Sequence, residues 1–166
     1  MVSIDEIVTA ARTGNVSLLQ QCTPDDVVHI DLNQYTKYKY EDDQDDQGTN
    51  QNVTVLHIAA KNGHDTFITA LYKLFGDTID VNTRDNDNYT PLLIAVRYGH
   101  ANCITTLYNI YGDKIYYAGD IYECNALMVA AKNGHANCIT TLHNIYGNKI
   151  DYNAVDVDDR NALLLA

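Results

Sequence analysis

Two stretches of this chain are nearly identical, and they lie 35 residues apart. Residues 99–115 read GHANCITTLYNIYGDKI and residues 134–150 read GHANCITTLHNIYGNKI, so the 17 positions differ only at Tyr108/His143 and Asp113/Asn148. A weaker copy, GHDTFITALY, begins one step earlier at Gly63. Self-similarity at a period of about 20–50 residues is typical of repeat proteins, in which each unit buries its apolar side against its neighbours. The sequence therefore predicts a stack of similar units.

Each unit has the pattern of two helices separated by a glycine. Residues 54–64, TVLHIAAKNGH, indicate a short helix that ends at a glycine cap, and residues 65–75 then place apolar side chains at helical spacing. The same pattern returns at Thr90, where Pro91 suits the first turn of a helix, and at Asn125. Turn-forming residues between the units predict projecting, hairpin-like loops. The fold class that follows is an all-α solenoid of stacked helix–turn–helix units.

The beginning of the chain fits a less regular unit. The sequence Ser3-Ile4-Asp5-Glu6 is a capping-box pattern, Gly14 is expected to stop that helix, and Pro24 is expected to mark the exit from a second short helix. We expect a single domain, 1–166, with an atypical first repeat at 3–33, an acidic loop insertion at 34–52, repeats at 53–88, 89–123 and 124–160, and the start of a further, truncated repeat at 161–166.

The insertion at 34–52 interrupts the period. Asn33 and Thr54 are 21 residues apart, whereas the matching positions of the next unit, Asn82 and Thr90, are only 8 apart. About 13 residues are therefore inserted. Five carboxylates within residues 41–46 repel one another and predict a mobile loop that tolerates deletion. The loop resembles half of an EF-hand, but Thr54 stands where calcium binding needs a glutamate.

The net charge of −11 argues against a nucleic acid or an anionic membrane as the partner, because both favour a basic surface. No apolar run is long enough to span a membrane, and the acidic start does not resemble a secretory signal. The four cysteines lack CxxC spacing, and Cys103 and Cys138 occupy one repeat position. We expect core thiols in a reducing compartment, the cytoplasm.

No catalytic motif is present: the sequence contains no P-loop, no G-x-S-x-G and no H-E-x-x-H. Of the six histidines, His64, His100 and His135 follow the glycines of successive units. One repeat apart, they are too distant to share a metal ion at ligand distances of about 2 Å. We expect no enzymatic activity, no cofactor and no metal site within these residues.

The pattern resembles the ankyrin-repeat family, strongly over residues 53–166 and weakly over 3–33. The period here is 35–36 rather than the 33 of that family. The matching positions are a hairpin aspartate (Asp85, Asp120, Asp156), the Thr90-Pro91-Leu92 triplet, His57, the glycine–histidine pairs and Asp80-Val81-Asn82.

This resemblance implies recognition of another protein through a concave face built from hairpin tips and first helices. The alternative is an interaction or targeting arm of a larger enzyme or secreted effector, which would act in the cytoplasm of a host cell. Leu163-Leu164-Leu165 ends the sequence with an apolar helix, so we expect that the chain is a fragment or that this end associates with another copy. The residues expected to bind the partner are Lys61, Asn62, Asn86, Asp87, Tyr89, Arg97, Tyr98, Ile121, Tyr122, Lys132 and Asn133.

Overall fold

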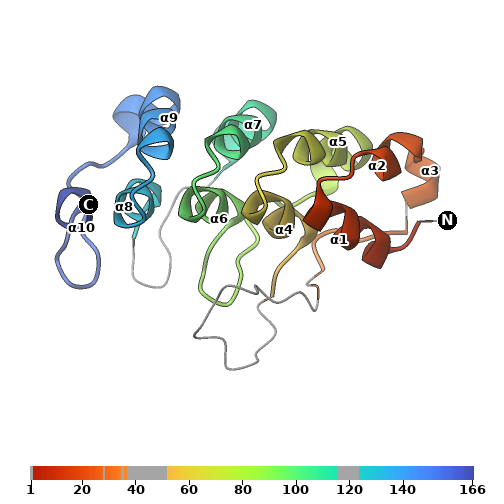
Figure 1. The fold of residues 1–166 in the computed structure, drawn as a ribbon, viewed down its shortest axis with the longest axis horizontal. Helices are drawn as coiled ribbons and strands as arrows, with labels where there is room; N and C mark the ends of the chain where they lie inside the picture. Colours follow the sequence, from red (N-terminus) through yellow and green to blue (C-terminus); the bar gives the residue numbers. More distant parts are fainter. Residues whose placement is uncertain (1, 28, 35, 37–51, 116–123) are drawn as a thin grey trace.

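A computed structural model of the chain describes residues 2–27, 29–34, 36, 52–115 and 124–166. Within these residues ten α-helices form an extended stack (Figure 1), and the only β-type pairing is an isolated antiparallel bridge between Thr36 and Val53. The all-α solenoid predicted from the sequence is therefore confirmed. The helices are α1 (Ile4–Thr13), α2 (Ser17–Gln21), α3 (Pro24–Val27), α4 (Val55–Lys61), α5 (Asp65–Phe75), α6 (Pro91–Arg97), α7 (Ala101–Tyr111), α8 (Ala126–Lys132), α9 (Ala136–Tyr146) and α10 (Ala162–Leu165).

The helices form two rows along the stack. The first helices of successive units, α4, α6, α8 and α10, pack side by side in one row, and the second helices, α5, α7 and α9, pack in the other. Each second helix runs into a short 3-10 turn, at Gly76–Thr78, Gly112–Lys114 and Gly147–Lys149. The loops between units project from the row of first helices, on the side away from the second helices (Figure 1).

The ends of the first helices follow from side-chain caps and glycines. Thr90 accepts a hydrogen bond from the backbone N–H of Leu93, and Asn125 accepts one from Met128, so both satisfy amides that the helix itself leaves unpaired. At the other end, Gly99 has a φ of 80°, a conformation in which an L side chain is strained. Gly63 and Gly134 adopt the same conformation in their own units.

Histidines hold successive units together. The Nε2 atom of His100 lies 2.7 Å from the carbonyl oxygen of Lys61, at the end of the preceding first helix. The ring of His100 also lies over Gly63, where an added side-chain carbon would stand 2.7 Å from Nδ1. His64 and His135 make the corresponding contacts with Arg12 and Arg97. The glycine–histidine column is therefore a structural junction between units.

Small residues allow the units to stack closely. Ala59, Ala60, Ala95 and Ala130 of the first helices are fully buried, and a methyl group lets the next helix approach closely. The thiols of Cys103 and Cys138 are buried and free, as expected, and burial raises their pKa to about 12 and about 11 respectively.

The first unit contains one short helix that the sequence did not predict. The capping box of Ser3 and Glu6 and the left-handed Gly14 are both present. The second short helix, α2, ends at Gln21, before Pro24 as expected, but Pro24 is also the first residue of a further short helix, α3. A proline fits there because the first helical residues need no N–H donor.

The acidic stretch 37–46 and the rest of the expected insertion, apart from residues 34, 36 and 52, lie outside the described residues, as do Asp120, Ile121 and Tyr122. Among the residues that the structure does describe, no helix has the length and apolarity needed to cross a membrane. The same residues contain no cluster of three histidine, cysteine or acidic side chains placed to hold a metal ion.

Candidate functional site

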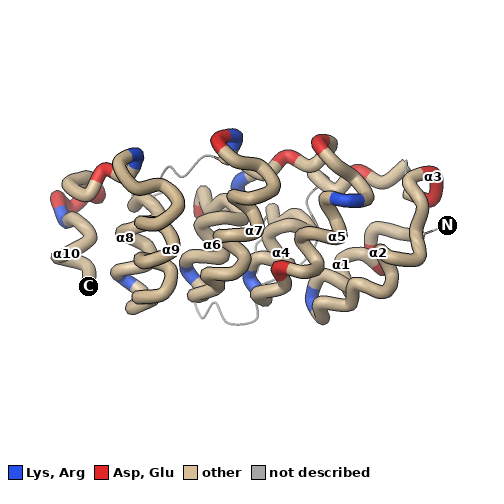
Figure 2. Tube along the Cα trace, turned by 90° about the horizontal axis from the view of Figure 1, so that it is seen from above, with Lys and Arg blue, Asp and Glu red and all other residues tan. Residues whose placement is uncertain are grey.

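A row of basic residues marks one edge of the stack. Each of four first helices carries one in its last turn, so the repeat places the basic side chains at equivalent positions (Figure 2). Cations at this end of a helix interact favourably with the helix dipole, so the row also has a structural role. The row consists of Arg12, Lys61, Arg97 and Lys132.

Two tyrosines interleave with this row between α4 and α6. The guanidinium carbon of Arg97 lies 5.1 Å from the centroid of the Tyr89 ring and 5.9 Å from that of the Tyr98 ring. On the other side, the Nζ atom of Lys61 lies 5.0 Å from the centroid of the Tyr98 ring. All these distances are within the range of cation–π attraction. The cluster therefore joins two units and holds Arg97 against two aromatic rings.

Tyr89 reaches this cluster from the tight turn that precedes α6. Within the turn, Asp85 donates its backbone N–H to the carbonyl of Tyr89 at 3.0 Å. Its carboxylate accepts the backbone N–H groups of Asp87 and Tyr89 at 3.0 and 2.8 Å. Asn88 has a φ of 67°, a value that asparagine tolerates better than most residues. One aspartate side chain thus fixes the path of the loop and the position of Tyr89.

His57 ties the turn to the preceding unit. Its Nδ1 atom accepts the backbone N–H of Thr54 at 3.2 Å, so the proton is on Nε2, which lies 3.0 Å from the carbonyl oxygen of Tyr89. The imidazole is fully buried. His57 therefore has a structural role: it locks α4 to the turn that carries Tyr89.

Burial gives the two polar side chains under the turn unusual acidities. Desolvation raises the pKa of Asp85 to about 7, although its hydrogen bond from Tyr89 and the charge of Arg97 oppose the rise. Desolvation lowers the pKa of His57 to about 4. Both groups are therefore least costly in their neutral forms, and neither belongs to a cluster of described residues that could hold a metal ion.

The turn at residues 156–160 repeats the hydrogen bonds of the turn at residues 85–89, although three of its five residues differ. Asp156 accepts the backbone N–H groups of Asp158 and Arg160, as Asp85 accepts those of Asp87 and Tyr89. Here Arg160 takes the position of Tyr89, and its side chain pairs with both Asp156 and Asp158. This hydrogen-bonded pair lowers the pKa of Asp156. The two turns thus share a backbone conformation, and the residue at the end of each turn makes its surface aromatic (Tyr89) or charged (Arg160).

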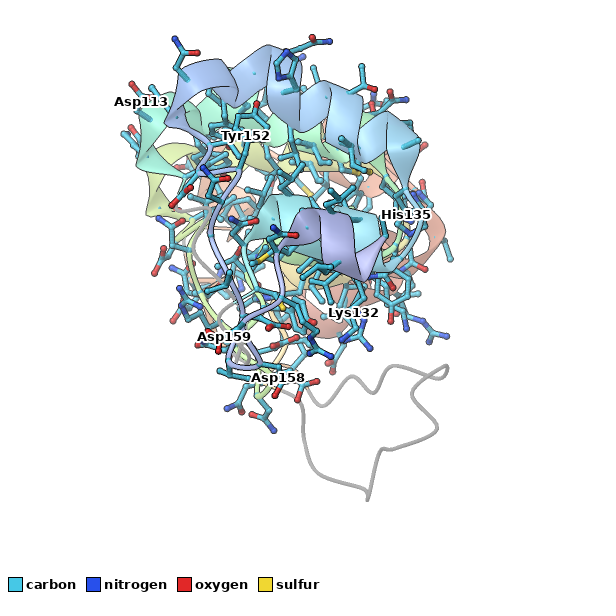
Figure 3. All side chains as sticks on the ribbon, turned by 90° about the vertical axis from the view of Figure 1, so that its left-hand side faces the viewer. Asp113, Lys132, His135, Tyr152, Asp158 and Asp159 are labelled. Atoms are coloured by element: carbon cyan, nitrogen blue, oxygen red, sulfur yellow. The ribbon has the colours of Figure 1, made fainter. Side chains whose placement is uncertain are left out.

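The loop tips and the first-helix ends lie on one side of the stack. Viewed from the C-terminal end, Asp158, Asp159 and Lys132 are all on the side opposite α9 (Figure 3). We call this surface the first-helix face and define it by Asn86, Asp87, Tyr89, Arg97, Tyr98 and Lys132.

The residues expected to bind a partner differ in how much surface they offer on this face. Asn86 and Lys132 are exposed, and Arg97 and Tyr98 are partly buried. Lys61 is only 7% exposed, because it lies beneath Tyr98. Asn62 and Asn133 are occupied within the fold, since each side-chain amide donates to a carbonyl of its own helix, Ile58 and Val129, at 2.8 Å. The sequence did not indicate this capping role, because asparagine after a helix is equally common at exposed turns.

The fold and this face define a class: a solenoid of helix pairs with a patterned surface of loop tips and first helices. The family model described as "Ankyrin repeats (3 copies)" matches residues 7–118, and the chain belongs to the ankyrin-repeat family. The match includes most of the first unit, where the sequence pattern is weakest. No curated protein matches the sequence.

Proposed function

We propose that this chain is a non-enzymatic binding module that recognises a partner protein through the first-helix face. Ankyrin repeats are generally protein–protein interaction modules, and ankyrin-repeat domains are typically not catalytic. The observation that supports this face in particular is the position of Arg97, which lies against the rings of both Tyr89 and Tyr98.

The chemistry of this cluster suits a binding surface. Tyrosine and arginine are the residues that most often dominate interface energies, and they do so when neighbouring groups hold them in place. Here Asp85 and His57 form hydrogen bonds with the backbone of Tyr89, and Lys61 lies against the ring of Tyr98. Side chains that are already ordered lose less conformational entropy on binding.

The opposite side of the stack provides a natural comparison. The second helices α7 and α9 expose Thr105, Asn109 and Thr140, which are small polar residues. Thr105 and Thr140 donate their hydroxyl groups to carbonyls within their own helices. We therefore expect this side to contribute little to the recognition of a partner.

The experiment measures how two sets of substitutions in this chain change its affinity for a captured partner protein. The first set is Arg97→Ala with Tyr98→Ala, and the control set is Thr105→Ala, Asn109→Ala and Thr140→Ala. The first should weaken binding by about 1–4 kcal/mol and the control by less than about 0.5 kcal/mol. Thermal unfolding of both sets shows whether a loss of binding is a loss of fold. The proposal is wrong if the control set weakens binding and the first set does not.

Tyr98→Phe adds a finer comparison, because it keeps the ring that contacts Lys61 and Arg97 and removes only the hydroxyl group. Binding that survives this change and is lost in Tyr98→Ala would depend on the ring rather than on a hydrogen bond.

We further propose the cytoplasm as the compartment in which the module works. Four free cysteines, three of them buried, are compatible with a reducing environment. Localisation of a tagged full-length chain by cell fractionation tests this proposal.

A further inference from the structure

The first helices carry positive charge in a chain that is acidic overall. The net charge of the chain is −11, but α4, α6 and α8 each contain a single Lys, Arg, Asp or Glu residue, and in every case it is basic. These residues are Lys61, Arg97 and Lys132, and Arg12 occupies the same place in α1. The basic row therefore gives one edge of the stack a positive charge of its own (Figure 2).

The members of the basic row differ in accessibility. Arg12 and Lys132 are exposed and Arg97 is partly buried, whereas Lys61 is only 7% exposed. The Nζ atom of Lys61 lies 5.0 Å from the centroid of the Tyr98 ring, and Tyr98 keeps part of its own surface exposed. A chain that runs along the row from α1 to α8 therefore meets one cation, then the ring of Tyr98, then two further cations.

Neighbouring helices in this row are separated by a distance that an extended peptide matches. The helices α1, α4, α6 and α8 pack against one another in this order, and packed helices lie about 8–10 Å apart. An extended chain advances about 3.3 Å per residue, so three residues cover about 10 Å. A polyproline II segment of three residues covers about 9 Å. One residue in every three of such a chain therefore faces successive members of the row.

Arg97 is well placed to bind a carboxylate. Its guanidinium carbon lies 5.1 Å and 5.9 Å from the ring centroids of Tyr89 and Tyr98, and these two rings order the side chain. A guanidinium group can contact aromatic rings through its faces and bind a carboxylate through two N–H groups in its plane. A carboxylate bound here gains from an arginine that is already ordered.

The acidic loop tips limit the kind of chain that fits beside the row. Asp158 and Asp159 are exposed in the turn before α10, and Asp87 is partly exposed in the turn before α6. Together with the net charge of −11, they repel a polymer that carries a negative charge on every unit, such as a nucleic acid. A protein segment with a few spaced carboxylates keeps the attraction of the row and reduces this repulsion.

We propose, resting on the function proposed above, that the partner presents an extended segment with carboxylates at its first, seventh and tenth residues and a proline or other apolar residue at its fourth. The carboxylates bind Arg12, Arg97 and Lys132, and the fourth residue packs on the ring of Tyr98. The segment belongs to another protein and lies along the ends of the first helices.

Synthetic peptides test this spacing directly. The matched peptide is ESQPSQESQE, blocked at both ends, and its reverse, EQSEQSPQSE, covers the second chain direction. The control peptide, EEESQPSQSQ, has the same composition but places its three carboxylates together. NMR titration of the labelled full chain at about 20 mM salt, where screening is weak, measures the affinities. One of the two matched directions should bind at least about 5-fold more tightly than the control.

Substitutions in the chain locate the contacts. Arg12→Ala, Arg97→Ala and Lys132→Ala should each weaken binding of the matched peptide about 2–5-fold. Lys73→Ala is the control, because Lys73 is an exposed lysine in the last turn of a second helix, α5. This control should change the affinity by less than about 1.5-fold. Thermal unfolding of each variant shows whether the fold is retained.

A double-mutant cycle tests the fourth residue of the segment. Replacing the proline of the matched peptide with serine should weaken binding to the wild type about 2–3-fold. The same replacement should have no effect on binding to Tyr98→Ala, because that variant lacks the ring on which the proline packs.

Reversal of single charges tests the register. Lys132→Glu should weaken binding of the matched peptide at least about 10-fold. A lysine in place of the terminal glutamate that lies three residues from the central one should restore the affinity. A lysine in place of the other terminal glutamate, six residues from the central one, should not. Arg12→Glu should show the opposite pattern.

Three results would overturn the proposal. The first is equal affinity for the matched and control peptides, which would show that only total charge matters. The second is rescue of Lys132→Glu by the lysine at the wrong end of the peptide. The third is tighter binding of a thymidine tetranucleotide, which carries three phosphates, than of either matched peptide. That result would make a nucleic acid the occupant.

A captured partner separates this proposal from the function proposed above. Binding that depends on Arg97 and Tyr98 but resists competition by both matched peptides overturns the acidic segment and leaves the proposed function intact. Binding that is unchanged by Arg97→Ala with Tyr98→Ala overturns the proposed function itself.

Discussion

The imidazole ring of His135 fills the space beside Gly99, so that a side-chain carbon on that glycine would stand 2.9 Å from Nδ1 of the ring. The same ring places Nε2 2.9 Å from the carbonyl oxygen of Arg97. The glycine is thus required twice over: its φ of 80° disfavours any side chain, and its neighbour leaves no room for one. His135 therefore links the end of α6 to the start of α9.

Gly99→Ala should be more destabilising than Gly134→Ala. Both substitutions place alanine in the left-handed region, which costs about 1 kcal/mol. Only Gly99→Ala also forces the ring of His135 to move, and we expect a total loss of about 2–3 kcal/mol for this variant. Urea denaturation of the two variants measures the difference. Equal losses would show that the histidine contact adds nothing.

Asp85 should make the protein more stable at mildly acidic pH than at neutral pH. Its pKa is raised by burial from 3.8 to about 7, so between these values the folded protein binds a proton that the unfolded chain has lost. Stability from this group is greatest near pH 4 and falls as the pH rises to about 7. Asp85→Asn keeps an oxygen acceptor for the turn but cannot ionise. Relative to the wild type, it should gain about 1–3 kcal/mol of stability between pH 5 and pH 8.

Asp156→Asn is the matched control, because it changes the same position of a turn whose aspartate has a lowered pKa. The carboxylate of Asp156 stabilises the fold when ionised, so this variant should lose stability relative to the wild type as the pH rises above the ordinary range of the carboxyl group. A shift in the same direction as that of Asp85→Asn would contradict the assignment of opposite environments.

His57 should act in the opposite sense to Asp85 in the same pH range. Burial lowers its pKa from 6.5 to about 4, so the unfolded chain binds a proton there before the folded protein does. Its contribution to stability is present above about pH 6.5 and is lost as the pH falls towards 4, by about 2–3 kcal/mol. In Asp85→Asn the carboxyl group that offsets this effect of His57 is absent. The free energy of unfolding of this variant should therefore fall more steeply than that of the wild type as the pH decreases. Urea titrations at pH 4.5, 5.5 and 6.5 test this; an unchanged slope would exclude the compensation.

Tyr111→Phe should preserve or increase stability. The hydroxyl oxygen of Tyr111 is buried, and no described residue forms a hydrogen bond with it. The ring itself packs edge-on against Tyr72, with 5.3 Å between centroids, and phenylalanine retains that contact. We expect a gain of up to about 1 kcal/mol from removing an unsatisfied polar group. A clear loss of stability on calorimetry would show that the hydroxyl group has a partner after all.

Lys132 should affect the rate of association with a partner more than the lifetime of the complex. It is exposed at the edge of the first-helix face, and peripheral charges act mainly through long-range steering. Lys132→Ala should therefore change the association rate at low salt and have little effect near 1 M salt, where screening is nearly complete. Surface plasmon resonance at both salt concentrations separates the two rates. A change confined to the dissociation rate would place Lys132 inside the interface.

The local pattern of the sequence was sufficient to predict the helices and their order. Alanine, leucine and isoleucine recur at helical spacing, and glycine or a capping residue marks each end. The exception is α3, which was not predicted, because a proline is equally compatible with the exit from one helix and with the first turn of another.

The candidate site was predicted less completely. Repeat position alone placed Arg97, Tyr98 and Lys132 on one face, because each unit repeats the geometry of the last. It did not show that Lys61 lies beneath Tyr98 or that Asn62 and Asn133 cap their own helices. Those outcomes depend on which neighbour a flexible side chain reaches, and that neighbour belongs to another unit or another turn.

The sequence by itself determined the fold class, because a repeated pattern with a constant period has few ways to bury its apolar side other than stacking. Only the tertiary structure decided what each repeated residue does. His135 lies over Gly99 while Gly134 remains open, although the two glycines are equivalent in sequence. The reason is physical: the environment of a residue in a stack is completed by the following unit, which lies about 35 residues away along the chain.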